Sequence, residues 1–262
     1  PNPCIDCNRY LKFDKLYMRA KELDRDYVVT GHYARVEKDE NGRFLLKKAL
    51  DNTKDQSYVL YCLTQEQLRH TIFPLGEMRK SQAREIAESQ GFINARKADS
   101  QDICFVQNGS YVDFIEQYTG KNYPDGDFLD TNGNIIGRHK GVIRYTVGQR
   151  KGLGISAPEP LYVKAVNRVS NTVTLSYNDG LYSSIVKAGD INLISVPEIK
   201  GEMRVKAKVR YRHTEQWATV TQNGDTITAV FDEPQRAVTC GQALVLYDGD
   251  TVVGGGTIIE VE

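Results

Sequence analysis

Residues 203–212 have the sequence Met203-Arg-Val-Lys-Ala-Lys-Val-Arg-Tyr-Arg212. Apolar and basic residues alternate along this stretch, and a strand sends alternate side chains to opposite faces. One face is therefore predicted to be apolar and the other to carry cations about 6.6–7 Å apart. We call these cations the basic stripe: Arg204, Lys206, Lys208, Arg210 and Arg212. Two interpretations are open, a surface that follows nucleic-acid phosphates or an edge strand protected by charge.

Similar alternating runs fill the chain from Leu161 onward. Asn-Asp-Gly, Gln-Asn-Gly-Asp and Asp-Gly-Asp turns join them. Strands at this spacing with such turns predict a β-barrel or a β-sandwich. The runs cover residues 161–166, 172–176, 203–212, 216–221, 226–231 and 243–247. Trp217 is interpreted as a core residue, and Gly254-Gly-Gly256 as a bend in a strand.

Helix and strand patterns mix over residues 1–106, as in an α/β layer. Apolar residues at helical spacing predict a helix over 12–23, with Phe13, Leu16, Tyr17, Ala20 and Leu23 on its apolar face. A strand is predicted at 27–30, and a hairpin that turns at 40–42 follows it. Ser81 and Gly91 bracket another helix, whose predicted inner face carries Ala83, Ile86 and Ala87.

The middle of the chain has a different charge pattern. Residues 107–136 hold five acidic residues and one basic residue, whereas residues 137–168 hold seven basic residues and one acidic residue. A helix is predicted over 110–120 and a hairpin at Asn132-Gly133. Two basic clusters follow, Arg138-His-Lys-Gly141 and Gln149-Arg-Lys-Gly152. The predicted domains are therefore 1–106, 107–163 and 164–262.

The composition limits the class of protein. The chain has 262 residues, with Lys plus Arg equal to Asp plus Glu at 34 each, so a uniformly basic coat is excluded while local basic patches are not. No apolar run approaches the length of a membrane span, so no membrane partner is expected. Five cysteines over this length are typical of cytosolic thiols rather than of a secreted disulfide framework, and a cytoplasmic location is expected.

Cys4 and Cys7 form a C-x-x-C pair that is predicted to lie just before a helix, where a thiolate is favoured. A zinc site would need a second ligand pair, which the remaining cysteines do not offer. A thioredoxin-like dithiol, two buried small side chains, and one reactive cysteine with a distant partner remain open. The distant partner would be Cys104, which follows the polar run Asp99-Ser-Gln-Asp102.

Several short motifs follow one another along the chain. They are Asn2-Pro-Cys-Ile-Asp-Cys-Asn8, Leu11-Lys-Phe13, Thr30-Gly-His-Tyr-Ala-Arg35, Lys54-Asp-Gln-Ser-Tyr58, Ser100-Gln-Asp-Ile-Cys-Phe105, Tyr145-Thr-Val-Gly-Gln-Arg-Lys-Gly-Leu-Gly154, Arg210-Tyr-Arg212 and Gly241-Gln242. In content and order they resemble the tRNA-specific 2-thiouridylases, bacterial enzymes that replace the C2 oxygen of the wobble uridine with sulfur. The interval between Cys7 and Cys104 also matches that family.

The resemblance implies three parts: the C-terminal part of a Rossmann-like α/β ATP-pyrophosphatase domain, a small central domain, and a C-terminal β-barrel. It implies that ATP, with Mg²⁺, adenylates the C2 oxygen and that a cysteine persulfide then delivers sulfur to C2. The implied partners are tRNA and a sulfur-relay protein that donates the persulfide. No metal ligands are predicted in the chain itself.

The resemblance also implies residue roles. Cys104 would carry the persulfide, and Cys7 would be the second catalytic cysteine, able to pair with Cys104 as a disulfide when sulfur leaves. Asn2, Pro3 and Cys4 would lie at the target base, although some relatives have Asp in place of Cys4. Gly31 would contact ATP. The residues that would contact tRNA are His32, Lys54, Asp55, Gln56, Arg210, Tyr211 and Gln242.

One family feature does not occur in the sequence, the Ser-Gly-Gly-x-Asp-Ser phosphate loop. We expect roughly a hundred residues with this loop to precede Pro1, and we expect the chain alone not to turn over, because such a loop binds the pyrophosphate. Two alternatives to the thiouridylase remain. One is a non-catalytic tRNA-docking module, and the other is a thiol-disulfide oxidoreductase centred on Cys4 and Cys7.

Overall fold

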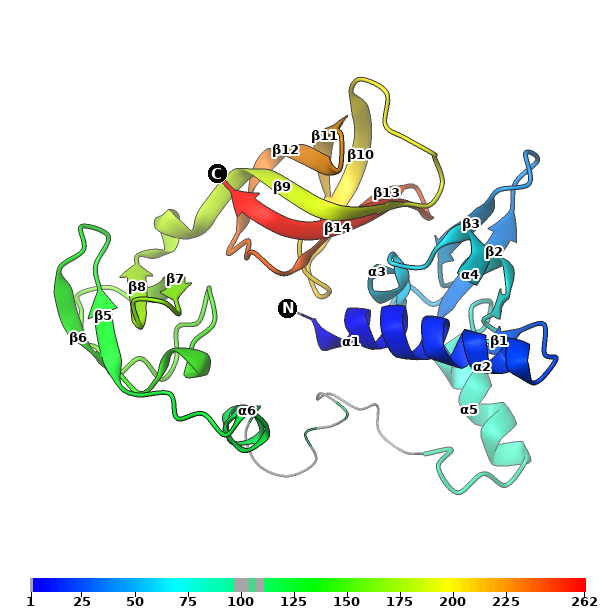
Figure 1. Ribbon diagram of the computed structural model, residues 1–262, viewed down its shortest axis with the longest axis horizontal. Helices are drawn as coiled ribbons and strands as arrows, with labels where there is room; N and C mark the ends of the chain where they lie inside the picture. Colours follow the sequence, from blue (N-terminus) through cyan, green and yellow to red (C-terminus); the bar gives the residue numbers. More distant parts are fainter. Residues whose placement is uncertain (1, 97–103, 105, 107–110) are drawn as a thin grey trace. The chain divides into compact units, whose positions relative to one another are not determined.

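The computed structural model describes residues 2–96, 104, 106 and 111–262 (Figure 1). The chain divides into two compact units. The first comprises residues 1–99, 185–233 and 240–262, and the second comprises residues 100–184 and 234–239. The first unit therefore combines the N-terminal α/β segment with most of the C-terminal strands.

A continuous helical segment opens the first unit. It consists of α1 (Pro3–Asp6), the π-helical η1 (Cys7–Lys15) and α2 (Leu16–Glu22). Asn2 has an extended backbone, and its side-chain oxygen accepts a hydrogen bond from the N–H of Cys4 at 3.1 Å, so Asn2 caps the helix. Pro3 occupies the first helical position, where its fixed φ is favourable. The expectation that the C-x-x-C pair precedes the helix is wrong, because both cysteines lie within it.

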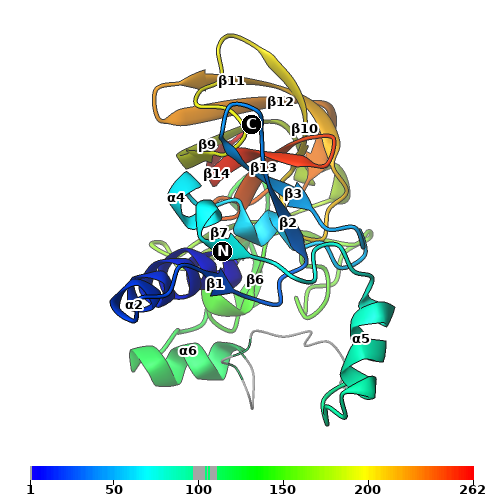
Figure 2. The same ribbon diagram turned by 90° about the vertical axis from the view of Figure 1, so that its right-hand side faces the viewer.

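Apolar spacing predicted the buried faces of the helices incompletely. Phe13 and Tyr17 are buried as expected, whereas Leu16 and Leu23 are exposed. The π-helical stretch explains the difference, because its i→i+5 bonds shift side chains away from a 3.6-residue period. Helix α5 (Lys80–Ser89) forms where predicted, yet this fully described helix has no buried residue. Figure 2 shows α5 standing clear of the strands of its unit, so its predicted inner face is wrong.

Short strands and helices complete the α/β segment. The strands β1 (Val28–Val29) and β4 (Thr71–Ile72) pair in parallel, and β2 (Ala34–Lys38) and β3 (Phe44–Lys48) form the predicted hairpin. Gly42 sits in its turn with φ of +84°, a conformation that glycine adopts without strain. Between the hairpin and β4 lie α3 (Ser57–Leu60) and α4 (Gln65–Arg69).

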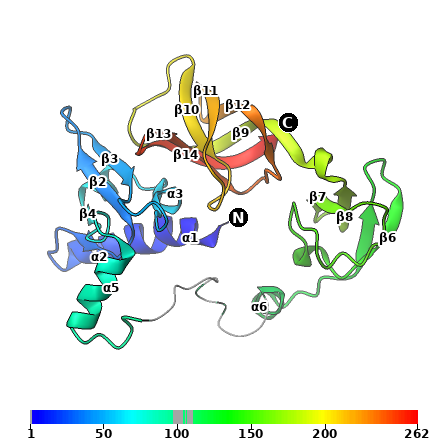
Figure 3. The ribbon, with the colours of Figure 1, turned by 180° about the vertical axis from the view of Figure 1, so that it is seen from behind.

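Six strands close into a barrel in the order β13-β10-β11-β12-β9-β14, since β13 also pairs with β14. Figure 3 shows β10, β11 and β12 side by side. The hairpin strand β3 pairs with β14 and extends the same sheet, which the sequence did not predict. Gly254-Gly-Gly256 lies within β14, as expected. The strands are β9 (Tyr182–Leu193), β10 (Met203–Lys208), β11 (Gln216–Asn223), β12 (Thr226–Arg236), β13 (Ala243–Asp248) and β14 (Thr251–Val261).

The α/β segment and the barrel share one hydrophobic core within the first unit. Side chains of α3, such as Tyr58, belong to the same buried cluster as Val245 of β13 and Val252 of β14. The side-chain amide of Asn192 on β9 donates to the carbonyl oxygens of Tyr61 at 2.7 Å and Leu63 at 2.9 Å. Residues that sit at the junction of the two parts are consequently held by both.

The second unit has its own small sheet, in the order β6-β5-β8-β7. Its core includes Phe128, Val163 and Val173. The runs at 161–166 and 172–176, expected among the barrel strands, belong to this sheet, because alternation reports a buried face but not which sheet a strand joins. The elements are α6 (Tyr111–Thr119), β5 (Gly126–Leu129), β6 (Ile135–His139), η2 (Val142–Arg144), β7 (Tyr162–Asn167), β8 (Thr172–Ser176) and η3 (Asn178–Leu181). The hairpin at Asn132-Gly133 forms as predicted, between β5 and β6.

Candidate functional site

The start of the helical segment presents two thiols. Cys4 is exposed and Cys7 is partly buried, and none of the five described cysteines takes part in a disulfide. Cys62 differs, because burial raises the pKa of its thiol to about 11. Cys4 and Cys7 are therefore better placed to react than Cys62.

Hydrogen bonds to main-chain and side-chain groups hold the segment that contains Lys54, Asp55 and Gln56. The Asp55 carboxylate accepts hydrogen bonds from the N–H of Ala49 at 3.0 Å and from the hydroxyl of Ser57 at 2.7 Å. The side-chain oxygen of Gln56 accepts the N–H of Tyr33 at 3.0 Å, and the N–H of Gln56 donates to the Tyr33 carbonyl at 2.9 Å. Asp55 and Gln56 thus have structural partners as well as their predicted role toward tRNA.

Tyr211 joins this segment to the end of the barrel. Its hydroxyl donates to the carbonyl oxygen of Asp55 at 3.2 Å, and its ring lies 5.8 Å from that of Tyr58. Burial raises the pKa of Tyr211, and the charges of Asp55 and Cys4 raise it further. The Cys4 thiol and the Asp55 carboxylate therefore both lie near enough to Tyr211 to act on its hydroxyl, and the common role of the three residues stays a prediction.

Tyr58 is a residue that the sequence analysis did not single out. Its hydroxyl donates to the carbonyl oxygen of Ala243 at 2.8 Å, and Ala243 directly follows the predicted tRNA residue Gln242. The ring of Tyr58 lies 5.8 Å from the ring of Tyr211 and 5.8 Å from the ammonium of Lys208. The signal for it was present, because Tyr58 ends the motif that begins at Lys54.

The basic stripe only partly follows a strand. Arg204, Lys206 and Lys208 lie on β10, whereas Arg210 and Arg212 follow its end. The edge-strand interpretation is wrong, because β10 pairs with β11 on one side and with β13 on the other. Edge protection therefore does not explain the stripe, and its contact with a polyanionic ligand stays a prediction.

Trp217 lies beside the basic stripe rather than in the core. It is 49% exposed, so its predicted burial is wrong. The cations of Arg204 and Lys206 lie 5.2 and 5.3 Å from its ring centre. Arg204 also forms an ion pair with Asp232 through both carboxylate oxygens. Part of the positive charge on this face is therefore already neutralised.

His32 lies beneath the surface, next to the exposed Gly31. It is 8% exposed, and its ring packs against Phe13 and Phe73. Burial, together with the nearby charge of Lys12, lowers the pKa of His32 to about 4. The imidazole is consequently neutral at physiological pH. The main chain at Gly31 is open, since an added Cβ would meet only Leu75 Cδ1, at 3.6 Å.

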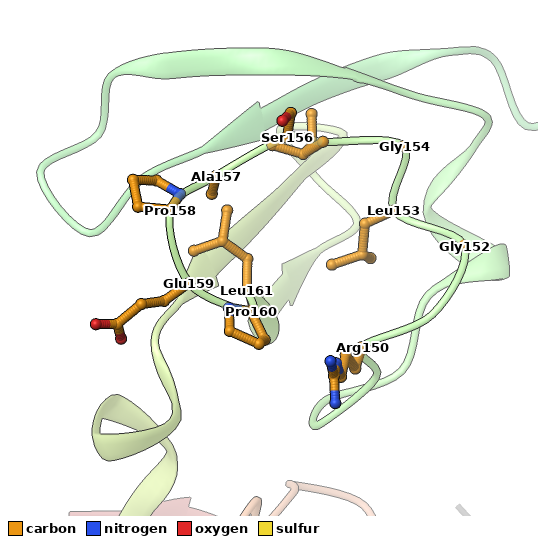
Figure 4. A pocket seen from close by; sticks show the side chains of 11 residues that line it. Arg150, Gly152, Leu153, Gly154, Ser156, Ala157, Pro158, Glu159, Pro160 and Leu161 are labelled. Carbon is orange, nitrogen blue, oxygen red and sulfur yellow. The ribbon is translucent and has the colours of Figure 1, made fainter.

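The second unit carries Cys104 and the two predicted basic clusters. Cys104 is exposed, but most of its motif lies outside the described residues. In the first cluster, Arg138 pairs with Asp127 at 3.0 Å, so that charge is already matched. Arg150 of the second cluster lines a pocket of about 480 Å³ that is formed by the loop 150–161 (Figure 4). Because Cys7 and Cys104 belong to different units, their meeting stays a prediction.

Two further features concern residues 2–96, 104, 106 and 111–262. No group of three His, Cys, Asp or Glu side chains in this part could hold a metal ion. No helix of the described residues has the length and apolar character to cross a membrane.

Comparison with known proteins shows which family the chain resembles. Three family models match the chain, described as the tRNA methyl transferase HUP domain over residues 1–108, the tRNA methyl transferase PRC-barrel domain over 112–177, and the aminomethyltransferase β-barrel domain over 183–258. The tRNA-specific 2-thiouridylase MnmA of Clostridioides difficile (strain 630) is 50% identical over 98% of this chain and 72% of its own length. The chain belongs to the tRNA-specific 2-thiouridylase family.

Other relatives give the same result. The tRNA-specific 2-thiouridylase MnmA 1 of Thermoanaerobacter sp. (strain X514) is 51% identical over 98% of this chain and 71% of its own length. The MnmA of Acidobacterium capsulatum is 47% identical over 99% of this chain and 72% of its own length. The predicted fold class, a Rossmann-like α/β part followed by a central domain and a C-terminal β-barrel, is confirmed. The match over 112–177 also agrees with the placement of β7 and β8 in the second unit.

Proposed function

We propose that this thiouridylase-family chain forms the tRNA-binding and sulfur-transferring part of an enzyme that thiolates C2 of the wobble uridine. The observation that carries the proposal is the hydrogen bond from Tyr211 to the Asp55 carbonyl oxygen, because it joins two separate motifs that are both predicted to contact the RNA. The relatives are named for this reaction, and the chain is about half identical to them. The predicted first domain, residues 1–106, goes with this proposal, whereas the predicted limit between 163 and 164 does not, because β7 and β8 belong to the sheet of the second unit.

When bound, ATP supplies adenylation of the C2 oxygen, which turns that oxygen into a leaving group. Gly31 is the proposed ATP contact, and its open main chain fits this role. Mg²⁺ is proposed to accompany ATP and to take its ligands from phosphate oxygens and water, as this ion commonly does. That the chain turns over only together with a phosphate loop remains part of the proposal.

Sulfur transfer is proposed to use two cysteines. The terminal sulfur of a Cys104 persulfide attacks C2 and displaces AMP, which leaves a Cys104–S–S–C2 linkage. The Cys7 thiolate then attacks the Cys104 sulfur, so that the S–S bond breaks, its electron pair leaves with the thiouridine sulfur, and a Cys7–Cys104 disulfide forms. An external thiol reduces this disulfide, and a sulfur-relay protein restores the persulfide.

The tRNA would be held by residues on both sides of the Tyr211–Asp55 bond. Asn2, Pro3 and Cys4 at the start of the helix are proposed to receive the base, which must leave its stack to enter an enzyme site. The proposed contacts to the remaining tRNA are His32, Lys54, Asp55, Gln56, Arg210, Tyr211 and Gln242. A buried, neutral His32 would act by shape or hydrogen bonding rather than as a cation. Five free thiols are consistent with the cytoplasmic location that we also propose.

The experiment that tests the proposal measures 2-thiouridine at the wobble position of tRNA by mass spectrometry. The full-length protein that contains this chain is incubated with tRNA, ATP, Mg²⁺ and a persulfide donor. Cys7→Ser and Cys104→Ser should each abolish product while leaving tRNA binding intact, and Cys240→Ser, at another exposed thiol, should retain activity. Binding without product in the unaltered protein would support the docking module. Thiol-disulfide exchange that is lost on Cys4→Ser but kept in Cys104→Ser, without any 2-thiouridine product, would support the dithiol oxidoreductase.

A further inference from the structure

A polar cavity of about 300 Å³ lies in the first unit beside the predicted base site. It opens between the end of β3, the segment before α3, and the outer face of β10 with the turn that follows. Its lining includes Lys48, Asp55, Lys206, Lys208, His213 and Glu215. Three lysines in one small cavity make it a candidate site for an anion.

The acidic residues of the cavity already have partners. Lys48 donates to Glu215 at 2.8 Å and to the carbonyl oxygen of Gly249 at 2.9 Å, and it lies 4.6 Å from the ring centre of Tyr247. The Asp55 carboxylate is engaged by Ala49 and Ser57. The lining therefore contains three lysines and two carboxylates, so its formal charge is positive.

Lys206 and Lys208 are the two lysines of the cavity other than Lys48, which is paired with Glu215. Within the described residues neither forms a hydrogen bond or ion pair with a carboxylate. Lys208 contacts the ring of Tyr58, and Lys206 contacts that of Trp217. Burial lowers the pKa of Lys208, although the charges of Asp55 and Glu215 act in the opposite direction. A partly desolvated ammonium gains more from an incoming anion than a fully hydrated one does.

The cavity and the predicted base site share a wall. Asp55 lines the cavity, and its carbonyl oxygen accepts the hydroxyl of Tyr211. The ring of Tyr58 lies 5.8 Å from the Tyr211 ring and 5.8 Å from the Lys208 ammonium. The Tyr58 ring therefore lies close both to the residue predicted to contact tRNA and to the cation in the cavity.

We propose that this cavity binds a backbone phosphate of the RNA, next to the nucleotide whose base lies at Cys4 and Tyr211. Lys208 and Lys206 contact the phosphate oxygens, and the Lys48–Glu215 pair fixes the opposite wall. The inference rests on the proposed function, because it requires RNA at Tyr211. A phosphodiester and a free phosphate or pyrophosphate share the chemistry that these lysines recognise, so the test separates these sources.

The test measures the affinity of the full-length protein for an anticodon stem-loop RNA over a series of salt concentrations. Lys208→Gln and Lys206→Gln should each weaken binding about three- to tenfold and reduce the slope of log K against log [salt] by about one. Lys187→Gln is the matched control, since Lys187 is a barrel lysine already paired with Glu260 and Glu262. Lys208→Arg should restore most of the affinity, which a merely structural loss would not allow.

A second arm locates the phosphate. Single methylphosphonate linkages are placed along the anticodon loop, and one linkage beside the target uridine should weaken binding to the unaltered protein but not to Lys208→Gln. The inference is overturned, while RNA binding stands, if no linkage weakens binding to the unaltered protein more than binding to Lys208→Gln. It is also overturned if Lys206→Gln and Lys208→Gln both keep the affinity and the salt slope of Lys187→Gln. If the unaltered protein does not bind the stem-loop, the proposed function fails first. Competition by millimolar phosphate or pyrophosphate that disappears in Lys208→Gln, without any linkage effect, would assign the cavity to a free anion instead.

Discussion

The hydroxyl group of Tyr211 donates a hydrogen bond to the main-chain carbonyl oxygen of Asp55 at 3.2 Å, across 156 residues of sequence. Tyr211 follows strand β10 of the barrel, and Asp55 precedes helix α3 of the α/β segment. Two parts of the chain that the sequence assigned to different domains thus meet within one unit, at residues predicted to touch the same tRNA. Single substitutions at this junction can therefore test its contribution to tRNA affinity and to stability.

Two substitutions of Tyr211 distinguish the contribution of its hydroxyl group from that of its aromatic ring. Tyr211→Phe removes the bond to Asp55 but keeps an aromatic face, and should weaken tRNA binding by about 1 kcal/mol. Tyr211→Ala also removes the surface on which a base can stack, and should cost about 1–3 kcal/mol more. Filter binding at fixed salt measures both. Equal affinities for the two variants would show that the ring makes no contact with RNA.

Tyr58→Phe should destabilise the first unit without removing its ring. The variant leaves the Ala243 carbonyl oxygen without its buried donor, at a cost of about 1–3 kcal/mol in the free energy of unfolding. Urea titration followed by circular dichroism gives this quantity. Tyr27→Phe, at an exposed tyrosine, is the control and should change stability by less than about 0.5 kcal/mol. A Tyr58→Phe variant as stable as this control would remove Tyr58 from the junction.

Stability should fall as the pH drops from about 6.5 toward 4. The pKa of His32 is about 4 in the folded protein, against 6.5 for an ordinary histidine. The unfolded chain therefore binds more protons in this window, and acidification favours it by about 2 kcal/mol at pH 5. Urea unfolding at pH 7.5 and pH 5.0 measures the loss, which should shrink in His32→Gln. An identical loss in that variant would show that another group is responsible.

Arg204 and Lys206 should contribute unequally to tRNA binding, although both belong to the basic stripe. Arg204 is already held by both oxygens of Asp232, so Arg204→Gln should reduce the salt dependence of affinity less than Lys206→Gln does. Asp232→Asn should release Arg204 and strengthen binding. Isothermal titration at several salt concentrations tests this order, and a larger effect of Arg204→Gln would contradict it.

Local sequence signals predicted much of this fold correctly. The Asn132-Gly133 turn predicted a hairpin, and the alternating runs beyond residue 203 predicted the barrel strands, because a two-residue period and turn chemistry act over a few residues. The helix start was misplaced, since Asn2 caps it ahead of both cysteines. The alternation of residues 162–176 could not reveal which sheet those strands join.

The candidate site depended on motifs more than on periodicity. Asp55 and Tyr211 were each selected from a separate motif, and the structure joins them by a hydrogen bond. Tyr58 was missed, and Trp217 was wrongly assigned to the core. Both errors have one cause, because the burial of an aromatic residue depends on long-range packing. Tyr58 is held by a strand that lies 185 residues further along the chain. No pattern within a short window contains that information.

The most direct test of the whole account is whether the thiols of Cys7 and Cys104 meet in the folded full-length protein. Mild oxidation followed by proteolysis and mass spectrometry under non-reducing conditions identifies which cysteines are joined. The account predicts a peptide pair linked through Cys7 and Cys104, absent from Cys7→Ser and present in Cys240→Ser. A disulfide between Cys4 and Cys7, with Cys104 left as a thiol, would contradict it.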